Sequence, residues 1–581
     1  MSDDAFIARR LLLASALGGL LALTGAVTAS CRSHANKTGA MSAEKRYGGQ
    51  LVIPVYGSGF TRSSLDPAGQ SFVPIASQIF ETLARRGDPF GEVIEPSLAE
   101  SWETSSDGLI WRFHLRAGAS FHDDECFPGG RGRELRAEDV VYSWQRLIAS
   151  KQLPAGFQVF GRFIAGGREF HDRNAQTVSG LQAIDDRTLE VRLVAPFVGF
   201  LRAVTWFPTS IVPREAVEHY GDDFPKHPVG TGPFRLIEWD VNRRVVIARH
   251  PRYWGRENRP PGRPLPFLDA IEYVLYPDAL TAFQSVINGQ SDMAPVPSAA
   301  VDTITEREGA SGEFRLREEY ARRGLYLFNY LPDPYADYLC FNMNGKTPFA
   351  RDARLRRAVG YVIQPPGAAP QCPLLRPLPG VPQPRGEGFY YDAERARALL
   401  REAGYAQGRG LPKLRLLLLP QAQANERAGI RALQRELGLK IEEVVIPAAE
   451  MDAAVREGNF DLLMDTWEFF YPDPTPLLER FQSDAPPEDN IARYRNPRFD
   501  ALFAEMIGEQ NKERRASLIT EIEDLLLKDA AWIVIANQAA GAPSPVMMRR
   551  SVHLANNAEG RINLSTVWLD QADAPAGRVA R

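Results

Sequence analysis

Segments with strand and helix patterns alternate along most of this 581-residue chain, and that alternation restricts the folds it can form. Residues 50–55 and 109–115 have the apolar patterns of short strands, and residues 139–148 carry apolar side chains at helical spacing. Further patterns of these two kinds lie at residues 189–193, 245–248, 271–276 and 278–288. The sequence therefore predicts an α/β or mixed α+β fold, and the lack of a fixed-period repeat argues against a solenoid or a propeller.

Proline and glycine crowd residues 365–388, a composition that neither a helix nor a central strand tolerates, so this stretch is predicted to be a loop or linker. A second alternating series follows. Residues 414–419 are apolar apart from Arg415, which is the pattern of a strand buried on both faces. The other patterns of this series are helices at 393–403, 425–437 and 451–457 and strands at 441–446 and 460–467. We therefore expect a second α/β body after the linker.

The N-terminus has the pattern of an export signal. An apolar run at residues 11–27 follows Arg9 and Arg10 and ends in the small residues 28–30. After it, the chain has no other apolar run of about 18 residues, the length that a membrane-spanning helix needs. The mature protein is therefore predicted to be either free outside the cytoplasm or tethered to the membrane. The paired arginines leave the twin-arginine and the general secretory routes both open.

Cys31 directly follows the small residues and so resembles the cysteine of a bacterial lipobox, which becomes the lipidated first residue after cleavage. The usual lipobox has a branched apolar residue three positions before the cysteine, where this chain has Thr28. We expect residues 1–30 to be the signal, Cys31 to carry lipid, and residues 31–46 to form a tether.

Composition and motif searches disfavour nucleic-acid binding and catalysis. The chain has 68 Lys+Arg and 72 Asp+Glu, a net charge of −4 that gives no general attraction to nucleic acid. No phosphate-binding loop, nucleophile elbow or zinc-protease motif is present. Residues 122–126 (HDDEC) have metal-ligand chemistry, but their close spacing favours a solvated turn. We predict no enzyme activity, metal or cofactor; one disulfide among Cys126, Cys340 and Cys372 stays possible.

Short sequence blocks follow one another across most of the chain after the tether. They are 65–67 (LDP), 80–83 (FETL), 96–103 (PSLAESWE), 111–116 (WRFHLR), 121–123 (FHD), 137–144 (AEDVVYSW), 231–234 (TGPF), 251–254 (PRYW), 352–358 (DARLRRA) and 391–405 (YDAERARALLREAGY). In this order they resemble the extracytoplasmic solute-binding proteins of peptide- and nickel-type ABC importers. The large apolar surfaces of Trp102, Trp144 and Trp254 are expected to pack in the core.

The resemblance implies a two-lobed periplasmic-binding-protein-like fold that closes over a solute, with an extra subdomain in lobe I. Lobe I is expected to combine residues 47–78, 199–336 and 544–581, the subdomain to span 79–198, and lobe II to span 337–543. One departure from the family lies at residues 361–366 (YVIQPP), where members continue a helix, so this part of lobe II is expected to be rebuilt.

The resemblance also points to one strand of lobe II as the ligand site. In oligopeptide-binding members this strand carries a tryptophan followed three residues later by an aspartate that pairs with the peptide α-amine. Here the tryptophan is Trp467, but the aspartate is replaced by Phe470. Asp465 or Glu468 could supply the missing carboxylate or could instead be solvated, with Thr466 between them. Phe470 either contacts the ligand or fills a gap in the lobe.

The first lobe contributes a glycine-containing loop, where Gly59, Phe60 and Thr61 are expected to line the cleft; a plain turn is the alternative. The resemblance thus implies an exported, periplasmic or cell-surface monomer that binds a peptide or peptide-like solute and delivers it to an ABC permease in the membrane. A non-peptide or N-blocked solute, or a sensor that presents its closed form to a membrane receptor, remain open.

Overall fold

The computed structural model describes residues 47–57, 64–69, 73–88, 91–256, 265–308, 313–330, 335–364, 375, 378, 381, 388–419, 424–538, 544–554 and 564–570. Cys31 and the predicted cleft residues Gly59, Phe60 and Thr61 lie outside the described residues, as does most of the predicted linker at 365–388. Predictions about these positions stay predictions.

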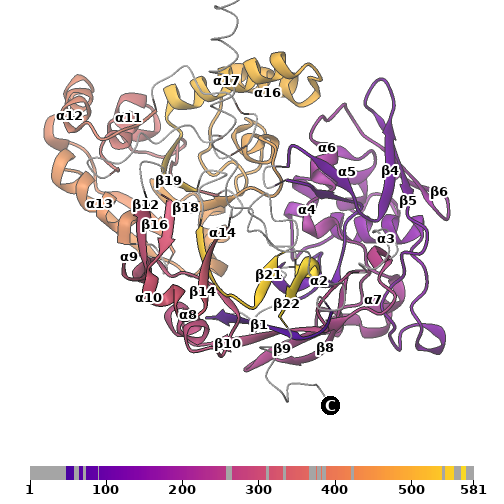
Figure 1. Cartoon of the computed structure of the whole chain (residues 1–581). Helices are drawn as coiled ribbons and strands as arrows, with labels where there is room; N and C mark the ends of the chain where they lie inside the picture. The colour runs from indigo at the N-terminus through magenta and orange to yellow at the C-terminus, as the bar shows by residue number, and fades with distance from the viewer. Residues whose placement is uncertain are drawn as a thin grey trace, which may run out of the picture. The chain divides into compact units, whose positions relative to one another are not determined.

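Two four-stranded sheets organise the first part of the chain (Figure 1). Sheet A has the order β1 (Gln50–Tyr56), β10 (Ala270–Tyr276), β9 (Arg244–Arg249), β8 (Phe234–Asp240), and β1 runs parallel to β10. Sheet B is antiparallel, with the order β4 (Ala99–Thr104), β5 (Ile110–Leu115), β7 (Thr188–Arg192), β6 (Leu181–Asp185). Strands in which apolar and polar residues alternate thus form sheets that have apolar side chains on one face.

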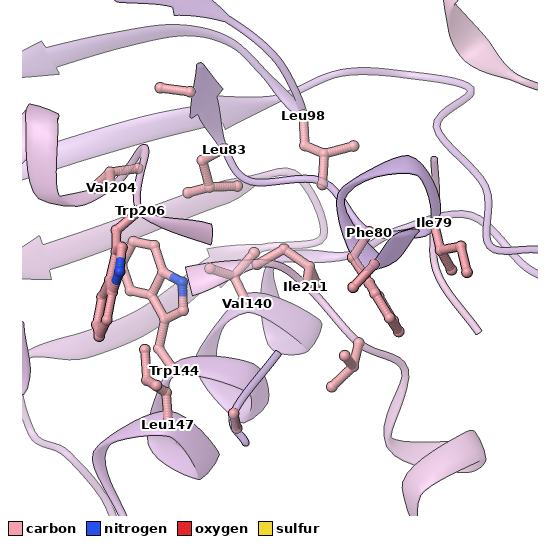
Figure 2. Close-up of a cluster of buried hydrophobic side chains, with 14 of the residues drawn as sticks. Ile79, Phe80, Leu83, Leu98, Val140, Trp144, Leu147, Val204, Trp206 and Ile211 are labelled. Atoms are coloured by element: carbon pink, nitrogen blue, oxygen red, sulfur yellow. The ribbon is translucent and has the colours of Figure 1, made fainter. Parts of the chain in front are cut away.

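One hydrophobic core joins sheets A and B, and we call it the first core. It contains Ile271 and Val245 of sheet A together with Phe113 and Val191 of sheet B. Figure 2 shows part of this core, including Val140, Trp144 and Leu147 of α3 (Ala137–Ile148) and Val204 and Trp206 from the segment after α6 (Phe200–Ala203). As predicted, Trp144 is fully buried, and Trp102 and Trp254 pack against this core.

A five-stranded sheet, sheet C, organises the second body. Its order is β17 (Ile441–Val445), β16 (Leu414–Leu418), β18 (Leu462–Glu468), β15 (Tyr335–Phe341), β19 (Trp532–Gln538). Helices cover both faces: α11 (Ala353–Gly360), α12 (Ala393–Glu402) and α13 (Ala424–Leu437) on one, α14 (Ala448–Glu457), α16 (Pro497–Gly508) and α17 (Lys512–Asp529) on the other. The predicted burial of both faces of 414–419 is confirmed, because Leu416 and Leu417 enter different cores.

The chain passes twice between the two bodies. A three-stranded sheet has the order β11 (Met293–Pro295), β20 (Ser544–Arg549), β14 (Leu325–Tyr330). The chain leaves this sheet after β14 to enter sheet C at β15, and it returns from β19 of sheet C to β20. The other elements are α2 (Val73–Ile79), β2 (Ala84–Arg86), β3 (Ile94–Pro96), α4 (Ala155–Gln158), α5 (Gly167–His171), α7 (Arg214–Tyr220), α8 (Ala279–Ile287), α9 (Ser298–Ile304), β12 (Thr305–Glu308), β13 (Glu313–Leu316), α10 (Glu318–Ala321), α15 (Thr475–Leu478), β21 (Val552–Leu554) and β22 (Val567–Leu569).

One local expectation is wrong. His122, predicted to lie in a solvated turn, is only 2% exposed. Its Nε2 lies 3.0 Å from the Gly232 carbonyl oxygen, and its ring lies 4.8 Å from that of His250. A chain segment distant in sequence covers this polar-looking stretch, which local composition does not reveal. Burial, followed by the charge of His250, lowers the pKa of His122 to about 3, so the ring is neutral.

Candidate functional site

Trp467 lies near the end of β18, the central strand of sheet C, and is 7% exposed. The Phe470 ring stands edge-on to it with centroids 5.1 Å apart, and the Arg480 guanidinium lies 4.6 Å from its ring centroid. Its Nε1 is buried and has no hydrogen-bond partner among the described residues. Trp467 is therefore mostly a packed side chain, with one unused donor.

Phe470 is partly buried and packs against two cores at once. On one side it meets Trp467, and on the other it meets Trp206, with ring centroids 5.3 Å apart. Trp206 belongs to the first core and is 8% exposed. The position where the resemblance expects an amine-binding aspartate thus holds an aromatic ring between the two bodies. Sequence reasoning missed Trp206, because nothing local links it to Phe470.

Asp465 lies on the same side of β18 as Trp467, as the alternation of a strand requires. The Tyr338 hydroxyl is 3.4 Å from its Oδ2, a long hydrogen bond, and within the described residues no Lys or Arg nitrogen lies within 4.0 Å of it. Burial raises the pKa of Asp465, and the backbone hydrogen bond from Thr466, the charge of Arg480 and the Tyr338 hydroxyl only partly oppose this shift. The ionised form of Asp465 is therefore only weakly stabilised by its neighbours.

Thr466 points to the opposite face of sheet C, where its hydroxyl donates to Asp337 Oδ1 at 2.6 Å. Burial raises the pKa of Asp337 despite this bond. Glu468 ends β18 and pairs with Tyr335 in the ladder. The structure thus brings Trp467 and Phe470 into contact and places Asp465 on the same face of β18 as Trp467 and Thr466 on the opposite face, while the ligand roles of these four residues and of Glu468 stay predictions.

Directly after Phe470, the chain forms a fully satisfied polar junction around Asp473, which is 1% exposed. Arg515 Nη2 of α17 lies 3.0 Å from both carboxylate oxygens, and Arg202 Nη1 of α6 lies 3.7 Å from Oδ2. The Thr475 amide and hydroxyl also donate to Oδ1, at 3.0 and 2.6 Å. Burial alone would raise the pKa of Asp473, but these partners outweigh it and hold that pKa below its usual value.

Three further side-chain contacts join the same two bodies. The Tyr471 hydroxyl donates to the Val159 carbonyl oxygen at 2.9 Å, and Gln158 Nε2 donates to Asp489 Oδ2 at 2.9 Å. Arg162 Nη1 lies 3.3 Å from Glu479 Oε2. Burial raises the pKa of Glu479 to about 8, with Arg162 opposing the shift.

The described residues also include a cavity that lies apart from the Trp467 cluster. A pocket of about 260 Å³ is lined by Met343, Asn344, Ser483, Ala485, Pro487, Asn490, Arg493 and Arg495, none of which belongs to the Trp467 cluster. In the described ranges, no group of three or more His, Cys, Asp or Glu residues could hold a metal, and Cys126 and Cys340 are free thiols. No helix in the part that the structure describes is long and apolar enough to cross a membrane.

Comparisons with known proteins agree with this architecture. Residues 93–489 match the sequence profile of the bacterial extracellular solute-binding proteins, family 5. The periplasmic oligopeptide-binding protein OppA of Escherichia coli (strain K12) is 28% identical over 83% of this chain and 86% of its own. Heme-binding protein A of Haemophilus influenzae is 26% identical over 90% of this chain and 94% of its own. The periplasmic binding protein DppA from Helicobacter pylori, solved in complex with the peptide STSA, superposes with a TM-score of 0.70 at 22% identity, covering 91% of this chain and 99% of that one.

Proposed function

The chain belongs to the bacterial extracellular solute-binding proteins of family 5, and from this premise we propose that it is the substrate-binding component of an ABC importer, which captures a peptide or peptide-like solute between two lobes and delivers it to a membrane permease. The observation that carries the proposal is the family match over residues 93–489, which spans elements of both bodies. The oligopeptide- and dipeptide-binding relatives support a peptide-like solute.

The two bodies correspond to the two lobes of this proposal. Lobe I holds residues 47–78, 199–336 and 544–581, with the subdomain at 79–198, and lobe II holds 337–543. The chain passes from the three-stranded sheet to sheet C between β14 and β15 and passes back between β19 and β20, which supports these boundaries. Chain crossings of this kind allow two lobes to close on a solute by a hinge motion.

A second candidate within this function is a solute without a free amine. Phe470 offers an aromatic ring where the resemblance expects a carboxylate, and the nearby Asp465 has a raised pKa. Desolvating an ammonium group there would cost free energy that no well-supported anion offsets. The relative named for heme binding supports the idea that members of this family take solutes other than peptides.

The direct test is to identify what the protein carries. Protein purified from the cell envelope under native conditions should release a peptide or an N-blocked peptide-like molecule, detectable by mass spectrometry. Small-angle scattering of the emptied protein with and without that molecule should give a smaller radius of gyration in its presence. An unchanged radius at saturation would contradict capture by closure.

Export, lipidation and a monomeric, non-catalytic role complete the proposal. The pattern that ends at Cys31 supports an exported, periplasmic or cell-surface protein that is anchored to a membrane through lipid on Cys31. Labelled fatty acid should enter the wild type and not Cys31→Ala. Equal labelling of the two would show that the anchor assignment is wrong.

A further inference from the structure

Residues 470–482 of lobe II, which we call the docking segment, lie against lobe I. Tyr471 is 1% exposed and belongs to the first core, although the strand that precedes it, β18, belongs to sheet C. Phe470 contacts Trp206, and Arg162 reaches both Glu479 and Gln482, the latter at 3.4 Å. A segment of one lobe therefore completes the core of the other.

The backbone of lobe I leaves room for this segment at two glycines. Gly91 has a φ of +68°, and a Cβ there would lie 2.1 Å from Pro472 Cγ. A Cβ at Gly199 would lie 2.5 Å from the Phe197 ring of the same lobe and 3.0 Å from the carboxyl carbon of Asp473. A side chain at Gly91 would push the docking segment away, so the close approach at this position depends on glycine.

Asp473 is neutralised from both lobes, but unequally. Arg515 of lobe II holds both carboxylate oxygens at 3.0 Å, whereas Arg202 of lobe I stands 3.7 Å away and also donates from Nε to the Gly91 carbonyl oxygen at 3.2 Å. If the lobes separated, Arg515 would still pair with Asp473, and no buried charge would be left alone. The Arg202 contact is thus one that can form and break.

We infer that Asp473 and Arg202 form a closure joint, a contact that raises the population of closed lobes without touching the solute. The inference rests on the proposed function in taking the lobes to open and close. Asp473 acts as a positioning residue: its pairing with Arg202 holds the preceding Phe470 against Trp206 beside Trp467. Such a contact changes the equilibrium between open and closed lobes in the absence of solute. It therefore determines how much of the free energy of solute binding is needed to close the lobes.

Hydrogen exchange of the protein without any solute tests the joint. The Val198 amide of lobe I donates to the Ile507 carbonyl oxygen of lobe II at 3.2 Å, so its exchange reports separation of the lobes. Arg202→Met should speed this exchange by about two- to fivefold, the effect of losing one partly exposed charge contact on closure. Arg202→Lys, which keeps the charge, should lie between Arg202→Met and the wild type.

Controls separate the joint from local damage. The Ala203 amide, bonded to Gly199 within α6, should exchange at its wild-type rate in Arg202→Met. Arg112→Met, which removes an ion pair with Glu190 inside sheet B, should leave Val198 unchanged. Unchanged Val198 exchange in Arg202→Met, or equal acceleration of Val198 and Ala203, would overturn the joint. If the joint's exchange effect appears but no peptide-like solute is found, the proposed function fails and the joint stands.

Discussion

Asp465 and Asp473 lie eight positions apart on the same stretch of lobe II, yet their surroundings differ in kind. Asp473 is fully buried and has Arg515, Arg202 and two Thr475 donors, so its pKa is lowered. Asp465 has burial without comparable partners, so its pKa is raised. Burial by itself therefore does not define the role of a carboxylate. Asp473 is the centre of a structural junction, whereas Asp465 has few partners in the fold.

The largest expected effect comes from breaking the junction. Asp473→Asn should lower the free energy of unfolding by about 3–5 kcal/mol, because Arg515 would lose its buried counter-ion. Asp465→Asn should cost no stability at pH 7, since it removes no close ion pair and burial raises the pKa of the Asp465 carboxyl group. Urea unfolding at pH 7 compares the two variants, and similar losses would contradict the distinction between them.

A carboxylate at position 470, between Asp465 and Asp473 in the sequence, should give the site a partner for a free amine. Phe470→Asp should shift binding toward free-amine peptides by about tenfold, because a charge-assisted hydrogen bond to an ammonium is worth about 1.5–3 kcal/mol and part of it should be recovered. Competition between free and acetylated peptide pools measures the shift. The same preference in Phe470→Asn would mean that polarity, and not charge, is responsible.

The two aspartates should also respond to pH with opposite sign. Because the pKa of Asp465 is raised above its usual value of 3.8 in the folded protein, ionising this group costs stability, so Asp465→Asn should become more stable than the wild type as pH rises through the folded-state pKa. The lowered pKa of Asp473 means that its contribution is present above 3.8 and lost as pH falls below it. Urea unfolding measured at several pH values from 3 to 7 tests both signs. A wild type that is more stable than Asp465→Asn at pH 7 would contradict the prediction for Asp465.

The smallest effect concerns a single hydrogen bond of the docking segment. Tyr471→Phe removes the donor to the Val159 carbonyl and keeps the ring in the first core, so it should lower the free energy of unfolding by about 0.5–1.5 kcal/mol. Tyr56→Phe, at an exposed position, is the control and should change nothing measurable. Equal results for the two variants would show that the bond contributes no stability.

Local patterns predicted the elements of this fold well and its contacts poorly. The strand expected at 460–467 runs from Leu462 to Glu468. The helix expected at 425–437 is Ala424–Leu437. These depend on periodicity within one segment, which a sequence displays directly.

Contacts between distant segments could not be predicted in this way. Trp206 meets Phe470, and Arg202 meets Asp473, only because the chain folds back on itself. The burial of His122 has the same origin, since the covering backbone around Gly232 comes much later in the chain. No local sequence pattern identifies such pairs. The family resemblance suggests roles only for residues that lie in the matching sequence blocks.

Calorimetric titration of the wild type with matched pools of free and N-acetylated tetrapeptides tests the central claim most directly. We predict that peptides bind and that the acetylated pool binds at least as tightly as the free pool, because Phe470 replaces the carboxylate that would pair with an ammonium group and desolvating that group costs free energy. A clear preference for free amines that disappears in Asp465→Asn or Glu468→Gln, or no binding of either pool, would contradict it.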